Sequence, residues 1–429
     1  MTRVGLRYGR GEMQTVLPRG SRAEVLHPRS LPVKGDIAEE IRRALEHPIG
    51  SEPLHCLARD RQDAVVLACD LTRDVPDSII IPQILDELNR GGIPDERITV
   101  MVAGGAHRPI TEQEADERFG SKVLSRVQLA AHVATDKDAL DLIGTSSFGT
   151  EIWINRLVAG SSLIVGTGCI IPHVIAGYGG GRKLIVPGVA GAETIRGNHC
   201  PENVNADGVG FCLVKGNRIH EELIEAAQMA RLEFIINVVW DGDGGLVEAV
   251  AGDTLAAWEH GVELAAQLYT VPVEARCDIL LTTGGGAPSD VNFYQAVRGL
   301  QVGLPTLRDG GAAILVAACS EGVGSDRLQS WLRDATCPEE VLRRRDEEGF
   351  DIHGEHIACY LAERVFPRFR VFLVSDLPPD VVSEMMMTPA ETIEQAYAAA
   401  VEHVGGGIPH VIVNPYGAKV VPTLSEAER

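Results

Sequence analysis

Side chains suited to acid–base and anion-binding chemistry follow predicted strands of this chain. Asp70 and Arg73, His107, and His173 each come directly after a short run of apolar and β-branched residues. An imidazole with a pKa near ~6.5 exchanges protons at neutral pH, so two histidines in one site can supply acid and base on opposite sides of a substrate. An arginine such as Arg73, or Arg298 in the second half of the chain, can bind a carboxylate through two parallel hydrogen bonds. The pattern therefore indicates proton-transfer chemistry on a small carboxylate.

A structural interpretation of the same residues stays open. A single histidine at a strand end more often has a structural role, and Asp70 and Arg73 could cap the next helix and pair with each other. Three histidines, with His199 as the third, two arginines and a lysine at successive strand ends favour the chemical interpretation.

A glycine-rich run, Gly-Tyr-Gly-Gly-Gly-Arg-Lys, ends at Lys183. Glycines let backbone N–H groups approach an anion closely, which is typical of phosphate-binding loops. A Walker loop is excluded because Leu184 stands where the Ser or Thr that binds magnesium is required. A lysine in such a poorly charged loop can instead be a covalent attachment point, since burial lowers the pKa of its amine and makes it nucleophilic.

The elements that must position these residues alternate between strands and helices, which predicts an α/β fold with mostly parallel sheets. Ligands of such folds bind beyond the carboxyl ends of the strands, where the candidate residues stand. The expected elements are a hairpin at 4–18, strands at 63–70, 97–104, 127–134, 162–166, 232–240, 277–283, 312–319, 370–376 and 410–415, and helices at 79–90, from 111 onward, 219–231, 292–299 and 391–404.

The length of 429 residues predicts two or three domains. A second series of strands and helices begins near Cys277, so we expect two α/β domains with an active-site cleft between them. We expect an N-terminal domain at 1–272 and a C-terminal domain at 273–404, joined by a linker at 269–276. The last residues, 405–429, are expected to pack back on the first domain.

Composition excludes several functional classes. Lys plus Arg number 39 against 60 Asp plus Glu, a formal net charge of −21, which disfavours binding to nucleic acid or anionic membranes. The nine cysteines are an odd count without a C-x-x-C pair, which indicates reduced thiols. The basic residues at the start are followed by no apolar segment typical of a secretory signal. We therefore expect a cytoplasmic protein.

Several separated motifs occur together in one order. The patterns Asp70-x-Thr72-Arg73-x-x-Pro76 and Gly105-x-His107-Arg108 precede His173, the loop that ends at Lys183, Pro187-Gly188 and Asn198-His199, and Tyr294-Gln295-Ala-Val-Arg298-Gly follows in the second half. This arrangement resembles the nickel-pincer lactate racemase family of 2-hydroxy acid racemases and epimerases. Agreement of several motifs in order is far more specific than any one of them.

The resemblance implies a cofactor and a role for each matching residue. The cofactor is a nickel-bearing pyridinium-3,5-bisthiocarboxylic acid mononucleotide, the nickel-pincer nucleotide, which cofactor-synthesis enzymes must supply. Lys183 would be its covalent tether and His199 the nickel ligand, while His107 and His173 would be the acid–base pair. The remaining implied contacts are Asp70, Thr72, Gly179, Gly180 and Gly181 for the cofactor, with Asp70 supporting Arg73 or the cofactor, and Arg73, Gln295 and Arg298 for the substrate.

The implied reaction is reversible hydride transfer. The C–H group of a 2-hydroxy acid is a very poor acid, whereas hydride removal coupled to loss of the hydroxyl proton gives a neutral 2-keto group, and the cofactor supplies what side chains lack. One departure concerns Arg298, because the family pattern has a lysine at this position. The identity of the 2-hydroxy acid therefore stays open.

Two other functions are compatible with parts of the pattern. An NAD(P)-dependent 2-hydroxy acid dehydrogenase would share the α/β fold, a catalytic histidine and an arginine for the carboxylate. It is disfavoured because the glycine run after residues 277–283 fails the dinucleotide fingerprint at Ser289. The second is a non-catalytic protein that binds or delivers a nickel cofactor or nucleotide.

Overall fold

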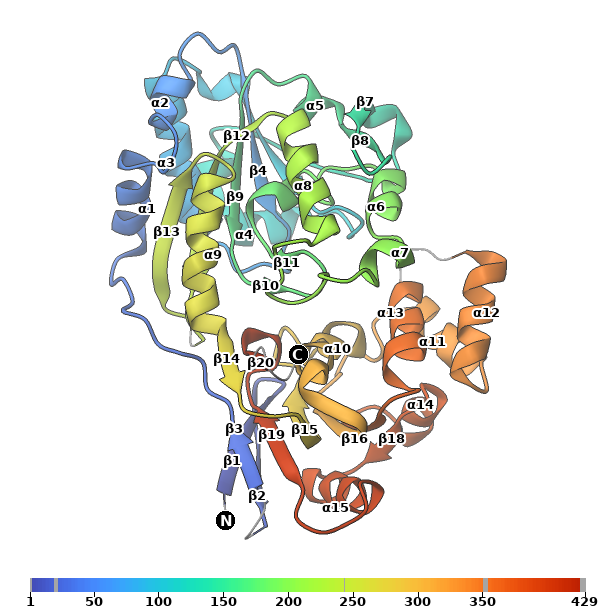
Figure 1. The fold of residues 1–429 in the computed structure, drawn as a ribbon. Helices are drawn as coiled ribbons and strands as arrows, with labels where there is room; N and C mark the ends of the chain where they lie inside the picture. The colour runs from blue at the N-terminus through green and yellow to red at the C-terminus, as the bar shows by residue number, and fades with distance from the viewer. Residues whose placement is uncertain (1, 19–21, 243, 350–353, 425–429) are drawn as a thin grey trace. The chain divides into compact units, whose positions relative to one another are not determined.

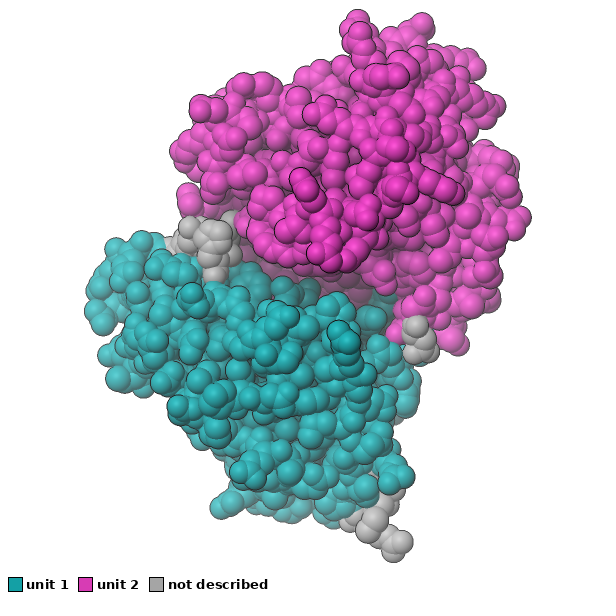
Figure 2. All heavy atoms as spheres, turned by 180° about the vertical axis from the view of Figure 1, so that it is seen from behind, with its two compact units in different colours: residues 1–29, 269–429 teal, residues 30–268 magenta. Residues whose placement is uncertain are grey.

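The computed structural model describes residues 2–18, 22–242, 244–349 and 354–424. The chain forms two compact units, which we call unit 1 (Met1–Arg29 and Tyr269–Arg429) and unit 2 (Ser30–Leu268). Figure 2 distinguishes them by colour. Each has its own sheet and its own apolar core, so the expected α/β class with mostly parallel sheets is confirmed.

Unit 2 is built on a six-stranded sheet in the order β13-β12-β9-β4-β5-β6, in which only β13 runs antiparallel to its neighbour. Its central strands are continuous apolar runs, because both faces of a parallel sheet are covered. The elements of unit 2 are α1 (Ile37–Glu46), α2 (Leu54–Leu57), β4 (Ala64–Cys69), α3 (Asp77–Arg90), η1 (Asp95–Arg97), β5 (Ile98–Ala103), α4 (Glu112–Leu124), β6 (Gln128–Ala131), η2 (Lys137–Ala139), β7 (Leu140–Thr145), β8 (Glu151–Asn155), α5 (Arg156–Ala159), β9 (Ile164–Cys169), β10 (Pro172–His173), β11 (Gly177–Tyr178), η3 (Gly181–Leu184), α6 (Ala192–Asn198), α7 (Pro201–Val204), α8 (Arg218–Met229), β12 (Leu232–Trp240), β13 (Leu246–Gly252) and α9 (Ala256–Tyr269).

Helices α1, α3 and α4 share one core with β4, β5, β9, β12 and β13. In α3 the buried Ile80, Ile84 and Leu88 recur every four residues, which places them on one face of the helix. The capping box expected at Thr111 is present, with the Thr111 and Glu114 side chains each bonded to the other's backbone, and α4 begins directly after Thr111.

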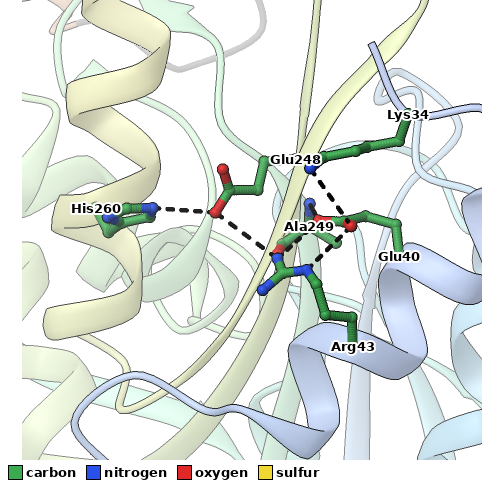
Figure 3. A network of polar contacts seen from close by, with 6 residues as sticks. All are labelled: Lys34, Glu40, Arg43, Glu248, Ala249 and His260. Carbon is green, nitrogen blue, oxygen red and sulfur yellow. Dashed lines mark hydrogen bonds and ion pairs between the residues drawn. The ribbon is translucent and has the colours of Figure 1, made fainter. Parts of the chain in front are cut away.

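A polar network fastens α1 to β13 (Figure 3). The buried Glu40 carboxylate accepts hydrogen bonds from Arg43 at 2.7 and 3.0 Å and from the Ala249 N–H at 3.3 Å. Arg43 also donates to the Ala249 carbonyl at 3.0 Å, and Glu248 accepts from His260 of α9 at 3.1 Å. This network therefore joins α1, β13 and α9, three elements of one unit.

Unit 1 contains a second six-stranded sheet, entirely parallel, in the order β18-β17-β16-β15-β19-β3. Helices α10 to α13 pack in one core and α15 in another, together with the strands (Figure 1). The elements are β1 (Thr2–Tyr8), β2 (Gly11–Leu17), β3 (Arg22–Val25), β14 (Thr270–Val273), β15 (Cys277–Thr283), α10 (Phe293–Gly303), η4 (Leu304–Thr306), β16 (Leu307–Val316), α11 (Asp326–Arg333), α12 (Pro338–Glu348), α13 (Glu355–Tyr360), the π-helical turn η5 (Leu361–Val365), β17 (Arg370–Val374), α14 (Pro379–Glu384), β18 (Thr388–Ala390), α15 (Ile393–His403), β19 (His410–Asn414), η6 (Gly417–Lys419) and β20 (Val421–Leu424).

The division into units differs from the expected boundaries at both ends of the chain. The expected hairpin at 4–18 forms as β1 and β2, but its apolar residues Val4, Leu6 and Leu17 belong to a core of unit 1, and β3 pairs with β19. The expected linker at 269–276 contains β14, which pairs with β20 near the C-terminus. The pairing of β3 with β19 and of β14 with β20 thus places 1–29 and the described part of 405–429 in unit 1.

Most other expected elements are confirmed within a few residues. The strand expected at 162–166 extends to Cys169, because β9 continues to pair with β12 as far as that residue. The expected cleft between the two domains stays a prediction.

Candidate functional site

Asp70 and His107 form a hydrogen-bonded pair at the carboxyl edge of the unit 2 sheet. β4 ends one residue before Asp70 and pairs in parallel with β5, so the turn after β5 brings His107 to the same edge. The Asp70 Oδ2 atom binds His107 Nδ1, and Oδ1 accepts hydrogen bonds from the N–H and hydroxyl of Thr72 at 3.1 and 2.6 Å. Sequence reasoning did not predict this partner for Asp70.

These contacts keep Asp70 ionised. Burial raises the pKa of its carboxyl group, but the hydrogen bonds from His107 and Thr72 outweigh that effect and lower the pKa to about 2. The carboxylate can only accept, so the neutral His107 ring carries its proton on Nδ1 and presents a lone pair at Nε2. About half of the His107 side chain is exposed. His107 is therefore arranged as a base accessible from solvent.

The turn that bears His107 is joined to the chain that follows Lys183. The Gly105 N–H donates to the Gly188 carbonyl at 2.8 Å. Gly105 has φ +59°, and a Cβ atom there would lie 3.2 Å from the Pro187 carbonyl oxygen. Glycine at this position allows the two segments to approach each other.

Arg73 does not pair with the Asp70 carboxylate, and the structural interpretation of these two residues is wrong. Among the described residues, the Arg73 guanidinium donates to the carbonyl and hydroxyl oxygens of Thr72 at 3.1 and 3.0 Å. Neither residue caps α3, whose N-cap is Pro76. Arg73 thus lies beside the Asp70–His107 pair with part of its side chain exposed.

A buried ion pair between Arg118 and Asp77 contacts the backbone of Arg73. Sequence reasoning did not predict it. Arg118 of α4 donates to the Asp77 carboxylate at 2.8 Å and to the Arg73 carbonyl at 3.2 Å. The Thr167 hydroxyl donates to the same carboxylate at 2.7 Å. Burial raises the pKa of Asp77, although Arg118 and Thr167 oppose it. The one signal in the sequence was the charge of Asp77, just before the apolar helix predicted at 79–90.

Lys183 lies in the short helix η3, which closes the glycine-rich loop. Burial, together with the positive charges of Arg73 and Arg182, lowers the pKa of its amine to about 7. The nearby Cys69 side chain opposes these effects. A large fraction of this amine is thus neutral and nucleophilic at neutral pH.

The glycines before Lys183 allow close packing of the loop on β12. The Gly181 N–H donates to Asn237 Oδ1 at 3.1 Å. Gly180 has φ +77°, and a Cβ atom there would lie 2.3 Å from the same oxygen. A larger residue at 180 would displace the loop, so the glycine run sets the position of Lys183.

His173 and His199 lie in unit 2, on segments before and after Lys183. The Nδ1 atom of His173 accepts hydrogen bonds from the N–H groups of Ile175 and Ala176 at 3.3 and 3.2 Å. A neutral His173 ring therefore carries its proton on Nε2, the opposite tautomer to His107. His199 follows the last residue of α6, and its N–H donates to the Ile195 carbonyl at 2.9 Å.

Gln295 and Arg298 lie in unit 1, one turn apart on α10. The Arg298 side chain donates to the Gln295 carbonyl at 3.1 Å and also binds Gln295 Oε1. The N-cap Asn292 accepts from the Gln295 N–H at 3.0 Å and so begins the helix beside them. The two side chains form one polar pair on a half-buried helix face.

The described residues contain no group of three or more His, Cys, Asp and Glu side chains that could hold a metal ion. Within the same residues, no helix is both long and apolar enough to span a membrane.

Two family models match both halves of the chain. The lactate racemase N-terminal domain matches residues 8–208, and the lactate racemase C-terminal domain matches residues 273–422. A lactate racemase from Thermoanaerobacterium thermosaccharolyticum is 33% identical over 426 residues, which cover 98% of this chain and 99% of that protein. The chain belongs to the lactate racemase family.

Further relatives agree with this assignment. A lactate racemase from Lactiplantibacillus plantarum is 35% identical over 385 residues, 89% of this chain and 90% of its own length. The structure of the T. thermosaccharolyticum lactate racemase apoprotein superposes with a TM-score of 0.90 at 31% identity and covers 98% of this chain and 100% of that chain. A Thermotoga maritima protein, with a TM-score of 0.65 at 18% identity over 90% of this chain and 98% of its own, shows the shared fold.

Membership of the lactate racemase family makes the chain an isomerase of the racemase type. The alternatives of a dehydrogenase and of a non-catalytic binding protein are therefore wrong.

Proposed function

We propose that this family member racemises or epimerises lactate or a related 2-hydroxy acid, with a nickel-pincer nucleotide tethered to Lys183. The observation that carries the proposal is the Lys183 amine in its glycine-lined loop, with Arg73 close enough to lower its pKa and the Asp70–His107 pair at the same sheet edge. The names of the relatives support lactate as the first substrate to test.

The residues around Lys183 suit a covalently held anionic group. An amine with a pKa of about 7 can form an amide-type bond near neutral pH, and Gly179, Gly180 and Gly181 would present their backbone to the group. Asp70 and Thr72 would contact the group on one side. His199 would bind nickel through its imidazole, a donor that nickel accepts readily. When bound, such a group would supply reversible hydride-transfer chemistry at C2 of the substrate.

His107 and His173 supply the proton transfers. The His107 Nε2 lone pair, kept available by Asp70, takes the proton of the substrate hydroxyl while the C–O bond gains double-bond character. His173 in the tautomer set by Ile175 and Ala176 holds a proton on Nε2. To donate, His173 would be the imidazolium, which passes its Nε2 proton to the substrate oxygen and is left as a neutral ring. The roles of His107 and His173 exchange for the opposite enantiomer.

Arg73, Gln295 and Arg298 would bind the substrate carboxylate and carbonyl oxygens. A guanidinium offers two parallel donors to a carboxylate, so Arg298 can replace a lysine with a more directional contact.

Cofactor-synthesis enzymes would act on the protein beforehand. We place this enzyme in the cytoplasm, because its nine free cysteines suit a reducing compartment.

The test is a screen of single enantiomers of 2-hydroxy acids with cofactor-loaded protein, followed by chiral chromatography. We expect loss of optical purity from both D- and L-lactate, or from both forms of another 2-hydroxy acid, without added NAD. Retention of optical purity across the screen, with the cofactor shown to be loaded, would contradict the proposal.

A further inference from the structure

One helix, α8, contacts the three segments that carry His173, Lys183 and His199. The contacts come from the N-cap and the first turns of α8, a helix that is labelled in Figure 1. The three side chains involved are all buried, and they are Asn217, His220 and Glu222.

Asn217 holds the segment around His173. Its Nδ2 atom donates to the Ile175 carbonyl at 2.8 Å and to the Leu213 carbonyl at 2.9 Å. The N–H of Ile175 in turn donates to His173 Nδ1. Asn217 also caps α8, because its Oδ1 accepts from the His220 N–H at 3.2 Å. The start of α8 and the His173 ring are thus two bonds apart in one hydrogen-bond chain.

His220 holds the residue before Lys183. Its Nδ1 accepts a hydrogen bond of 2.9 Å from Arg182, whose guanidinium lies 3.7 Å from the centre of the Trp258 ring. The His220 ring stacks on the same tryptophan at 4.9 Å. Burial and the Arg182 charge lower the pKa of His220 to about 3, so its ring is neutral and can accept.

Arg182 connects His220 to the backbone of the glycine-rich loop. It is fully buried and donates to the carbonyls of Ala176 and Tyr178 at 2.9 and 3.1 Å. The hydrogen bonds to these carbonyls and the contact with the indole ring together restrain the Arg182 guanidinium. Because Lys183 is the next residue, these contacts also restrain the position of its backbone.

Glu222 holds the residue before His199. Its Oε2 accepts a hydrogen bond of 2.5 Å from Asn198, and its Oε1 accepts one of 2.6 Å from the Ser146 hydroxyl. Asn198 is the last residue of α6, and its carbonyl accepts from Asn203 at 3.0 Å. The carboxylate therefore fixes the end of α6 from which the His199 side chain projects.

We propose that α8 is a positioning platform, in which Asn217, His220 and Glu222 are positioning residues for His173, Lys183 and His199, respectively. The proposal rests on the proposed function for the roles of those three residues. Burying polar side chains costs free energy unless they are bonded, and apolar residues could fill the same space. Each of these three bonds ends beside a different site residue, which is the arrangement that a shared support requires.

The experiment removes the three contacts one at a time. Asn217→Asp keeps the capping oxygen and loses the Nδ2 donor, His220→Phe keeps the ring on Trp258 and loses the acceptor, and Glu222→Met loses both acceptors at similar length. His220→Asn and Glu222→Gln are conservative variants that keep an acceptor. Glu225→Gln is the matched control, because Glu225 accepts from the Ser147 N–H and hydroxyl, both at 2.8 Å, and contacts no candidate site residue.

The first readout is labelling of Lys183 with acetic anhydride in the apoprotein over a pH series, quantified by peptide mass. His220→Phe should admit water to the loop, which raises the pKa of Lys183 from about 7 toward that of an ordinary lysine and slows labelling at pH 7. Glu222→Met and Glu225→Gln should keep the wild-type midpoint. His220→Asn should restore it.

The second readout is nickel content and the Lys183 adduct of protein matured with the cofactor. Glu222→Met should weaken nickel retention by ~10–100-fold, the usual effect of losing a support behind a metal ligand, while the adduct persists. Glu222→Gln should restore nickel retention. Asn217→Asp should keep both nickel and adduct but lower kcat, with a change in the pH profile of kcat and little change in KM.

Wild-type values in all three variants would overturn the proposal. It would also be overturned if all three lost every readout together, in proportion to their loss of melting temperature, because that pattern describes a helix needed only for folding. Wild-type protein that gains neither adduct nor nickel would contradict the proposed function instead, and the labelling comparison on apoprotein would still decide whether α8 positions Lys183.

Discussion

The Asp70 carboxylate binds both His107 and Thr72, and its contact with His107 determines which ring nitrogen of that histidine can accept a proton. An ionised partner on Nδ1 selects the tautomer that leaves Nε2 free to accept a proton. Asp70→Asn should lower racemisation by ~10²–10⁴-fold, the usual contribution of a general base, because an amide can hold the ring in either tautomer. Chiral analysis of initial rates checks this, with each rate divided by the amount of protein that carries nickel and the adduct, because Asp70 is also assigned a contact with the cofactor. A wild-type rate would remove Asp70 from the mechanism.

The same carboxylate contributes to stability in a defined pH window. Its pKa is lowered from 3.8 to about 2, so its contribution of about 2 kcal/mol is present above pH ~4 and is lost as the pH falls toward 2. The difference in free energy of unfolding between wild type and Asp70→Asn should therefore shrink between pH 5 and pH 3. Urea unfolding of the apoproteins measures it. Asp74→Asn, at an exposed neighbouring aspartate, should show no such trend.

Lys183 combines burial with neighbouring positive charge, and both lower the pKa of its amine. In the apoprotein its labelling should reach half its maximal rate near pH 7, well below the value for the exposed Lys137. After maturation, intact mass should show an adduct that Lys183→Ala lacks. An equal adduct on the Lys183→Ala protein would place the tether elsewhere.

At the scale of elements, the buried Glu40 carboxylate joins helix α1 to β13 in addition to the apolar side chains that α1 places in the core. Glu40 bonds to Arg43 on its own helix and to the backbone of β13, so its removal leaves several donors without their acceptor (Figure 3). Glu40→Ala should lower the free energy of unfolding by about 1–3 kcal/mol. Glu39→Ala, at an exposed position on the same helix, should change it by about 0.5 kcal/mol or less. Chemical denaturation compares the two, and equal effects would show that the network adds no stability.

For the whole molecule, the candidate residues divide between two independently packed units. Unit 2 carries the residues assigned to the cofactor, whereas Gln295 and Arg298 of unit 1 are assigned to the substrate. Arg298→Gln should therefore raise KM by ~10–100-fold, the loss of one charged hydrogen bond, and leave nickel and adduct unchanged. Steady-state kinetics and metal analysis together test this. A loss of nickel in that variant would contradict the separation of roles.

Sequence alone determined the α/β class, most of the strands and the candidate residues at their ends, because periodicity and turn residues are local signals within ten to fifteen positions. It missed α1, β13 and α9, and it assigned both chain ends to the wrong unit, since strand pairing between β3 and β19 or β14 and β20 has no local signal. Tertiary structure alone decided that Asp70 serves His107, that Arg182 is caged by Trp258 and His220, and that α8 reaches three segments of the site. These contacts join residues 24 or more positions apart, and which such residues meet depends on how the layers pack.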